Sequence, residues 1–257
     1  MNIVPGRISV LLPVLNNQEN LISCIESLLS QTYGDFEIIA IDDASSDNSF
    51  KILKKLRRKD KRLLISQNKK RYGMAVTLNR LVKMATGQYI TFCDANSISF
   101  PQRFEKQIDQ LIDNPKTAAL GTQVMYTDTD GRFLSQSNFA TTHEEVVPHM
   151  LGGSSIFPES VLLDRAMLPK DILYFSQKPY PHIYTDVLMK IADYATIENM
   201  QLYLFEKRLL PAKKSKTRQF LTSHVSLWLT SLRKYDYRPS IRSLVAPMTR
   251  SVTGSQA

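Results

Sequence analysis

Short apolar segments alternate with amphipathic segments through the first 94 residues of this chain, and this alternation constrains the fold more than any other feature. The apolar runs predict four buried strands, at residues 8–14, 36–42, 62–67 and 89–94. The segments between them predict three helices, at residues 17–33, 46–59 and 73–87. We expect Asn16 or Asn17 to cap the first helix and Gly87 to close the third. Helices between successive strands favour parallel pairing, so the sequence predicts a doubly wound, mostly parallel α/β sheet.

The chain changes character after Lys116. Strand-like segments become more frequent there, and Asp130-Gly131 predicts a hairpin turn between two of them. A length of 257 residues is enough for one large α/β domain with a smaller appendage. We therefore expect one domain in two halves, followed by a basic amphipathic helical extension, at residues 1–116, 117–213 and 214–257.

Polar clusters follow three of the predicted strands. They read "NNQEN" at 16–20, "DDASSDNS" at 42–49 and "DANS" at 94–97. Open α/β sheets bind their ligands at the carboxyl ends of the strands. Each cluster alone is also typical of an ordinary Asx-rich turn. Together they indicate a shared nucleotide cleft at the strand carboxyl ends.

The net charge of +9 is concentrated in two zones. Residues 51–71 carry eleven Lys and Arg against one acid, and residues 207–250 carry another eleven against one. Such zones favour phosphate-rich partners, either nucleic acid or an anionic membrane surface, although a solvated helix face explains the first zone equally well. Because the zones lack interleaved aromatic residues that stack on bases, a nucleic-acid partner is disfavoured.

The second basic zone contains a segment with helical periodicity. Leu221, Val225, Trp228 and Leu232 recur at helical spacing, with Ser, Thr, Arg and Lys on the other side. This pattern predicts either a helix that lies on a membrane surface or a helix whose apolar stripe packs on the domain.

The two cysteines, Cys24 and Cys93, are far apart in sequence and form no CxxC motif. We therefore expect buried reduced thiols of a cytosolic protein and neither a zinc site nor a catalytic thiol. The N-terminus lacks the pattern of a signal peptide, and no stretch reaches the roughly eighteen apolar residues of a membrane span. These features predict a cytoplasmic location, with peripheral attachment to the inner face of the membrane if the extension binds lipid.

Two long segments, "SVLLPVLNNQENLISCIESLLSQTYGDFEIIAIDDASSDNS" and "ATGQYITFCDANSISFPQRFEKQ", resemble the opening and central motifs of glycosyltransferase family 2. The resemblance extends from about Ile8 to Lys213. It implies the GT-A fold and an inverting transfer of sugar from a nucleotide-sugar donor, with a UDP-linked donor favoured. It also implies that residues 1–116 bind the donor and that residues 117–213 bind the acceptor.

The resemblance implies a set of nucleotide-binding residues: Pro13, Leu15, Asp42, Asp43, Arg71, Asn79, Asp94 and Ala95. Asp42 or Asp43 would accept a hydrogen bond from the imide N–H of uracil, with Asp43 favoured. The backbone from Pro13 to Leu15 would flank the base. Arg71 stands where some members place an arginine near the nucleotide, although a surface charge in a basic run explains it almost as well.

A departure from the family pattern affects the expected metal site. Asp94 falls on the first carboxylate of the family's Asp-x-Asp motif, which contacts the ribose, the metal and the diphosphate. Asn96 replaces a carboxylate that commonly ligates the metal. An amide oxygen coordinates a hard cation without charge, so metal affinity should fall. We predict that Asp94 and Asn96 hold Mn²⁺ or Mg²⁺ weakly and mainly together with the nucleotide, with complete loss of the metal as the alternative.

A second departure affects the catalytic base. Many relatives carry a Glu-Asp pair before an Asp-Leu-x-Leu-Arg segment, but "PHIYTDVLMKIADY" places Ile183 and Tyr184 at the pair. Asp186, which aligns with the later aspartate, is the nearest carboxylate and therefore the candidate base. His182 is a second candidate, although a lone histidine more often packs or hydrogen-bonds.

The leading hypothesis is an inverting glycosyltransferase, of the hexosyl or N-acetylhexosaminyl type, that acts in surface polysaccharide, glycolipid or glycoprotein synthesis. Its partners would be a nucleotide-sugar donor and a saccharide, lipid-linked or protein acceptor, with an anionic membrane surface as a further candidate. The alternative is a pseudo-glycosyltransferase, a nucleotide-binding or scaffold subunit without catalysis. Both departures favour this alternative, and donor-dependent UDP release with a true acceptor separates the two.

Overall fold

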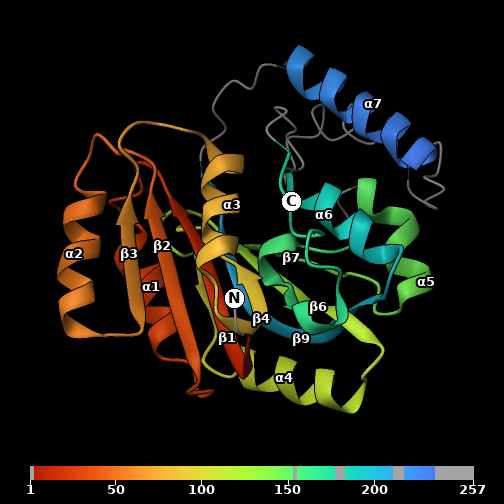
Figure 1. Cartoon of the computed structure of the whole chain (residues 1–257), viewed down its shortest axis with the longest axis horizontal. Coiled ribbons are helices and arrows are strands. Elements are labelled where there is room, and N and C mark those ends of the chain that lie inside the picture. Colours follow the sequence, from red (N-terminus) through yellow and green to blue (C-terminus); the bar gives the residue numbers. More distant parts are fainter. Residues whose placement is uncertain (1–2, 153–154, 177–182, 211–216, 235–257) are drawn as a thin grey trace.

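The computed structural model of the protein describes residues 3–152, 155–176, 183–210 and 217–234 (Figure 1). The strands of this part of the chain are β1 Val4–Val14, β2 Phe36–Asp42, β3 Leu63–Gln67, β4 Gly87–Phe92, β5 Ser97–Ser99, β6 Thr117–Thr127, β7 Phe133–Gln136, β8 Leu162–Asp164 and β9 Thr196–Arg208. The α-helices are α1 Leu21–Leu29, α2 Ser49–Lys59, α3 Met74–Met84, α4 Arg103–Asp113, α5 His143–Val146, α6 Ile183–Ala192 and α7 Thr217–Lys234. Three 3-10 segments complete the elements: η1 Val147–Gly152, η2 Pro158–Ser160 and η3 Arg165–Met167.

The strands form one mixed sheet in the order β3-β2-β1-β4-β8-β6-β9-β5, with β7 paired to β6. Strands β3, β2, β1 and β4 are parallel, which confirms the parallel pairing predicted for the first half. Strand β8 runs antiparallel to both β4 and β6, whereas β6 and β9 are parallel. The sheet therefore runs without a break through the boundary at Lys116, and its second half is mixed.

Helices cover both faces of the parallel strands, as the prediction of a doubly wound sheet requires (Figure 1). Successive β1 residues point to opposite faces: Val10 and Leu12 pack in one core cluster, and Leu11 packs in the other. Helices α1, α2 and α4 bury their apolar sides in the first cluster, and α3 and α6 bury theirs in the second. Each fully buried Leu or Ile stabilises the fold by roughly 1.5–3 kcal/mol before the entropy cost of ordering it.

The start of α1 differs from the prediction. The N-cap of α1 is Asn20, and no side chain caps the helix. The Asn16 side-chain oxygen instead accepts a hydrogen bond from Ser46 N at 2.9 Å, and the Asn17 oxygen accepts one from Leu15 N at 3.0 Å. Short polar side chains that bond to nearby backbone compete with helix capping, and here they fix the β1–α1 connection.

The predicted end of the third helix is also wrong. Helix α3 ends at Met84, and Gly87 begins strand β4. A side chain at position 87 would collide with the carbonyl oxygen of Arg7 on β1. The glycine is therefore required for the close approach of two strands and does not cap a helix.

The hairpin after β6 is confirmed. Strand β6 pairs antiparallel with β7, and the connection contains Gly131 with φ of +81°. The positive φ explains why Gly follows Asp130, because residues with a side chain rarely adopt it. This hairpin lies beside the second half of the sheet (Figure 1).

Helix α7 is the part of the 214–257 extension that the structure describes, with side chains described from residue 224 to residue 233. Leu227 is fully buried, and Trp228 packs half-buried against the same core cluster as α3 and α6. Val225 and Leu232 are exposed, and the Leu221 side chain lies outside the described residues. The residues predicted to form one apolar face therefore point in two directions: Trp228 packs on the domain, and Val225 and Leu232 are exposed to solvent. None of the described helices combines the length and hydropathy of a bilayer span.

Candidate functional site

The carboxyl ends of β1, β2 and β4 bring three of the predicted segments to one edge of the sheet. Val14 of β1 pairs with Asp42 of β2, and Asp43 N donates to Val14 O at 2.8 Å. On the other side of β1, Cys93 N donates to Leu11 O at 3.0 Å, which places Asp94 just beyond the end of β4. Chain order reverses direction at β1, and such a switch point is where doubly wound sheets bind ligands.

Asp43 is held by three neutral donors. Its Oδ1 accepts hydrogen bonds from the Asn68 amide at 2.6 Å and from Tyr72 N at 2.9 Å, and its Oδ2 accepts one from Gly73 N at 2.8 Å. Burial opposes ionisation, but these bonds and the nearby charge of Arg71 outweigh it and lower the pKa of Asp43. The carboxylate therefore fixes the loop before α3 and stays charged.

Asn68 orients Asp43, although it is not among the predicted site residues. Its amide donates to Asp43 and to Thr77 Oγ1, while its oxygen accepts a hydrogen bond from Arg80. Its backbone N–H donates to Asp42 O at 2.8 Å, so the position of Asn68 is set by the pairing of β2 with β3. A signal was present in the sequence, because an Asn follows the third predicted strand.

Asp42 is fully buried beside Asp43. Its Oδ2 accepts hydrogen bonds from Ser45 N at 3.1 Å and from the Gln67 amide at 3.0 Å. Its Oδ1 has no hydrogen-bond partner among the described residues. Both carboxylates thus lie at the expected strand end, and the choice between them for uracil stays a prediction.

The other predicted nucleotide residues differ in how freely they could meet a ligand. Pro13 and Leu15 are half-buried, Arg71 is exposed, and Ala95 is buried. Both polar atoms of the Asn79 amide bond to the backbone of Phe175, at 2.8 and 2.9 Å. Asn79 therefore ties α3 to the second half of the domain, and its role at the nucleotide stays a prediction.

Asp94 forms an ion pair that the sequence did not predict. Its Oδ1 lies 3.0 Å from the Lys207 ammonium at the end of β9 and accepts a hydrogen bond from Asn96 N at 2.7 Å. The Asp94 side chain is 33% exposed, whereas that of Lys207 is 17% exposed. Burial raises the pKa of Asp94, but the charge of Lys207 and the Asn96 hydrogen bond outweigh this effect and lower it.

Glu159 adds a second carboxylate to this cluster. Its Oε1 lies 3.8 Å from the Lys207 ammonium, and its side chain is 14% exposed. Burial raises the pKa of Glu159, and the positive charge of Lys207 offsets part of this increase. Burial acts to lower the pKa of Lys207, but Glu159 and Asp94 together raise it. Glu159, Lys207 and Asp94 therefore form a partly buried acid–base–acid cluster, which we call the charged cluster.

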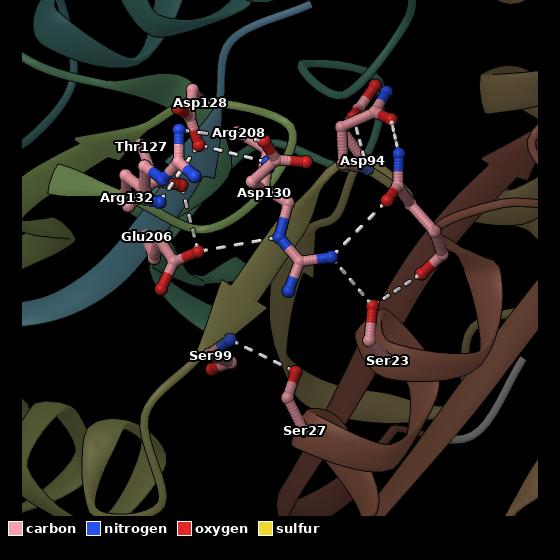
Figure 2. Close-up of polar contacts among 12 residues, drawn as sticks. Ser23, Ser27, Asp94, Ser99, Thr127, Asp128, Asp130, Arg132, Glu206 and Arg208 are labelled. Carbon is pink, nitrogen blue, oxygen red and sulfur yellow. Dashed lines mark hydrogen bonds and ion pairs between the residues drawn. The ribbon is translucent and has the colours of Figure 1, made fainter. Parts of the chain in front are cut away.

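The side chain of Asn96 is engaged in a separate hydrogen-bond chain. Its Oδ1 accepts a hydrogen bond from the Asn20 amide at 2.8 Å, and Asn20 Oδ1 accepts one from Arg208 at 3.3 Å. Arg208 also donates to Ser23 at 3.0 Å, and Figure 2 shows its contacts with Ser23 and with Glu206. The chain of bonds holds the turn after β4 against α1.

The predicted catalytic base lies on α6. The Oδ2 of buried Asp186 is 2.7 Å from the Lys190 ammonium one helical turn later. Tyr184, at a position where the resemblance implied a carboxylate, packs its ring on Phe92 of β4 at 4.9 Å between centroids. Burial raises the pKa of the Tyr184 hydroxyl, so it stays neutral. His182, the second candidate, lies outside the described residues.

The two cysteines lie side by side in the fold. Cys24 of α1 and Cys93 after β4 are both buried, and their sulfur atoms are 3.5 Å apart. Their burial agrees with the sequence expectation, whereas their proximity depends on how α1 packs on the sheet. Burial and the neighbouring thiol raise the pKa of Cys24, which makes it a poor nucleophile.

Comparisons with known proteins support this geometry. A profile of Glycosyl transferase family 2 matches residues 9–169. The Escherichia coli protein WfgD, a UDP-Glc:alpha-D-GlcNAc-diphosphoundecaprenol beta-1,3-glucosyltransferase, is 27% identical over 70% of this chain and 69% of its own. Matches to the first curated relatives span only 42% to 45% of those proteins, so this chain covers less than half of their length.

Two solved structures share the fold over almost the whole chain. TarS of S. aureus in complex with UDP-GlcNAc has a TM-score of 0.72 at 20% identity, over 97% of this chain and 74% of that one. A mannosyltransferase from Pyrobaculum calidifontis in complex with GDP-Man and Mn²⁺ has a TM-score of 0.67 at 14% identity, over 95% and 69%. At these identities the likeness shows the fold alone.

The residues around Asp94 do not fit the Mn²⁺ or Mg²⁺ predicted there. Asp94 already faces the Lys207 ammonium, and the Asn96 oxygen accepts a hydrogen bond from Asn20. The described part of the chain holds no cluster of three His, Cys, Asp or Glu side chains that could bind a metal. A divalent cation at Asp94 would be repelled by Lys207 unless the lysine moved.

The family profile covers more than half of the chain, from residue 9 to residue 169. The mixed α/β sheet matches solved enzymes over nearly its whole length. The chain therefore has a GT-A-like fold and belongs to glycosyl transferase family 2.

Proposed function

We propose that this protein is an inverting glycosyltransferase that moves a hexosyl or N-acetylhexosaminyl group from a UDP-linked donor to an acceptor hydroxyl. The observation that carries the proposal is the pair of carboxylates, Asp43 and Asp94, at the ends of strands on either side of β1. WfgD uses a UDP-sugar, and TarS was solved with UDP-GlcNAc, which supports uracil as the base.

The uracil end of the cleft is formed by Asp43 with the backbone from Pro13 to Leu15. Asp43 is charged and held in place by neutral donors, so it can accept a further hydrogen bond from the imide N–H of uracil. Arg71 is exposed beside this carboxylate and can approach the ribose or phosphates. Asp42, the alternative uracil ligand, is more deeply buried than Asp43.

Transfer would proceed by direct displacement at the anomeric carbon. The bond from that carbon to the β-phosphate oxygen breaks, the acceptor oxygen bonds from the opposite side, and its proton passes to a carboxylate. Asp186 is the base that the sequence predicts, but its carboxylate pairs with Lys190 within one helix. Glu159 lies in the charged cluster with Asp94, and this position supports Glu159 as the base with Asp186 as the alternative.

The acceptor is proposed to be a lipid-linked or surface saccharide. WfgD acts on a diphosphoundecaprenol-linked GlcNAc, and it is similar to this chain over 69% of its length. On this proposal residues 1–116 bind the donor, residues 117–213 bind the acceptor, and the 214–257 extension lies against an anionic membrane from the cytoplasmic side. The exposed side of α7 is compatible with that position.

A nucleotide-binding scaffold without catalysis is the second candidate. The observation that favours it is the packing of Tyr184 in the core, at a position where the family carries a carboxylate. Such a protein would bind UDP through the same uracil end. It would release no UDP from a donor, whatever the acceptor.

The test combines binding and turnover. Thermal shift with UDP, CDP and GDP should show stabilisation that is largest for UDP. UDP release from UDP-Glc and UDP-GlcNAc should then depend on a diphosphoundecaprenol-linked GlcNAc acceptor, and Asp43→Ala should lower this release through weaker binding of the donor. Binding of UDP without any acceptor-dependent release across a panel of lipid-linked saccharides would favour the scaffold, and preference for GDP would contradict the uracil assignment.

A further inference from the structure

Lys207 occupies the position at Asp94 that the sequence assigned to a divalent cation. We propose that the Lys207 ammonium offsets the charge of the donor's diphosphate and of the departing UDP, in place of a metal ion. This inference rests on the proposed function, which places the donor between Asp43 and Asp94. It concerns a residue in the second basic zone, where the sequence indicated only a general affinity for phosphate.

The ammonium has donor capacity to spare. A lysine has three N–H donors, and Asp94 Oδ1 at 3.0 Å accepts one of them. Glu159 Oε1, at 3.8 Å, is within ion-pair distance but beyond a normal hydrogen bond. At least one donor is therefore available for a phosphate oxygen that enters beside Asp94, whose side chain is one-third exposed.

The position of the ammonium is fixed by the sheet. Lys207 pairs with Ser97 of β5 on one side and with Tyr126 of β6 on the other, so its backbone lies in a three-stranded part of the ladder. Its ammonium lies 5.9 Å from the centroid of the Phe157 ring. A preset cation stabilises developing negative charge without the cost of reorganising solvent.

The side chains around Asp94 favour an ammonium over a divalent ion. Lys207 already pairs with Asp94 and lies within ion-pair distance of Glu159, so a divalent ion there would be repelled by the ammonium. The neutral Asn96 cannot add the third negative charge that a carboxylate would supply, and its oxygen is already bonded to Asn20. Because Lys207 is largely buried, its field on a nearby phosphate is weakly screened by solvent.

The step can be written with all charges placed. As the bond between the anomeric carbon and the β-phosphate oxygen breaks, its electron pair passes to that oxygen. Lys207 then donates hydrogen bonds to the diphosphate, which gains one negative charge, while the acceptor proton passes to the base. The lysine keeps its own protons, so it acts by charge and orientation and is not itself the acid.

Calorimetry on the full chain with UDP and with uridine tests this role. Parent UDP affinity should be the same in EDTA as with Mn²⁺. Lys207→Met keeps the length of the side chain and removes its charge, so UDP affinity should fall by about ten- to a hundredfold, as expected for one lost charged hydrogen bond. Uridine, which has no phosphate, should bind the variant as tightly as the parent, which also shows that the variant is folded.

Two further variants serve as controls. Lys55→Ala removes an exposed charge of α2 and should leave both affinities unchanged. Lys207→Arg keeps the charge and should retain part of the UDP affinity that Lys207→Met loses. Mn²⁺ should restore part of the UDP affinity that Lys207→Met loses, and it should not change the UDP affinity of the parent. The reason is that removal of the ammonium leaves Asp94 and Glu159 free to bind a cation.

Several results would overturn the assignment. One is loss of parent UDP affinity in EDTA, and another is an equal loss of UDP and uridine affinity in Lys207→Met. A third is a Lys207→Arg variant that binds uridine normally and UDP no better than Lys207→Met. If the parent binds neither UDP nor uridine, the proposed function fails and the assignment falls with it. If the parent binds UDP and Lys207→Met leaves the ratio of UDP to uridine affinity unchanged, only the assignment fails.

Discussion

The two strand-end carboxylates, Asp43 and Asp94, are held in different ways. Asp43 is surrounded by neutral donors, namely one side-chain amide and two backbone N–H groups. Asp94 is held by one backbone N–H and by the ammonium of Lys207, which Glu159 also approaches. The first arrangement belongs to the donor half alone, whereas the second joins residues of both halves.

This difference indicates what each end can do. Neutral donors orient Asp43 without cancelling its charge, so the carboxylate is ready to accept an N–H from a base. The ion pair at Asp94 cancels charge, so a diphosphate entering there must share Lys207 with Asp94. On the proposed function, Asp43 is therefore preset to recognise the base, and the charged cluster is suited to a group whose charge changes during the reaction.

The largest expected effect concerns the base in the acceptor half. Glu159→Gln keeps size and removes the proton-accepting charge, so it should lower kcat by about 10²–10⁴-fold, the usual contribution of a general base. Asp186→Asn breaks a helix ion pair with Lys190 and should act mainly on stability. Steady-state UDP release with a saturating lipid-linked acceptor measures both variants.

Thermal unfolding and UDP affinity provide the controls for this pair of variants. Glu159→Gln should bind UDP at least as tightly as the parent, because it removes a negative charge near the phosphates. A collapse of kcat in Asp186→Asn, with normal turnover in Glu159→Gln, would restore Asp186 as the base. The charged cluster would then have no part in acceptor activation.

The next effect concerns Arg103, which links residues 1–116 to residues 117–213. Arg103 is fully buried, and its guanidinium donates to Thr91 Oγ1 of β4 at 2.6 Å and to Glu159 O at 3.3 Å. Burial lowers the pKa of Arg103 to about 10. Arg103→Met should lower the free energy of unfolding by about 3 kcal/mol, because it leaves buried acceptors without donors. Urea unfolding measures the change.

An exposed arginine offers a matched control for this variant. Arg132 is largely exposed, and its ion pair with Asp130 is 4.0 Å long, so Arg132→Met should leave stability unchanged. Equal stability of Arg103→Met and the parent would mean that apolar packing alone stabilises the contact between the two halves. The position of the charged cluster would then not depend on Arg103.

A smaller effect is expected at the uracil end. Asp43→Asn should weaken UDP binding by roughly 1–3 kcal/mol, because one carboxylate oxygen becomes an NH₂ group and the imide N–H loses its charged acceptor. Cytosine has no hydrogen at the same ring nitrogen, so the parent should prefer UDP to CDP and the variant should lose this preference. Calorimetry with both nucleotides measures it. Equal weakening of UDP and CDP would show that Asp43 only holds the loop at Tyr72 and Gly73.

The acid stability of the protein gives a second check on Asp43. Its pKa in the folded protein lies below the ordinary value of 3.8. A lowered pKa stabilises the fold at pH values above 3.8, and this contribution is lost as pH falls through the lowered folded value. The difference in unfolding temperature between the parent and Asp43→Asn should therefore be constant near neutral pH and shrink below about pH 3.8.

The same contrast between the two ends explains how far the sequence could predict the site. The carboxylates at Asp42, Asp43 and Asp94 follow apolar strands, so hydrophobic pattern and local motif together place them at the sheet edge. The parallel register of β1 with β2 then brings Asp43 beside Val14. At this end, the residues that meet lie on neighbouring strands of one regular unit.

The charged cluster could not be predicted in that way. Glu159 lies on a single turn of 3-10 helix, and Lys207 lies at the end of a strand that enters the sheet far later in the chain. Their meeting at Asp94 depends on the mixed pairing of β8, β6 and β9, for which no local pattern exists. In the sequence Lys207 was only one of the basic residues of the second zone, and its ion pair with Asp94 is visible only in the fold.

The smallest expected effect concerns α7 and the membrane beyond the acceptor half. Trp228 and Leu227 pack toward the domain, whereas Val225 and Leu229 are exposed and line a shallow hollow of about 350 Å³ together with Arg233. A helix that uses one side for the domain and the other for lipid would place residues 117–213 near the lipid-linked acceptor proposed above. Replacing Val225 and Leu229 by Asp should reduce flotation with anionic vesicles by about three- to tenfold, through lost apolar burial and added repulsion.

Ser226→Asp, which adds one charge to the same helix and removes no apolar surface, should have a smaller effect. Binding should also weaken with salt, and a chain ending at Lys216 that still floats in a salt-sensitive way would show that α7 is not the part that binds the membrane.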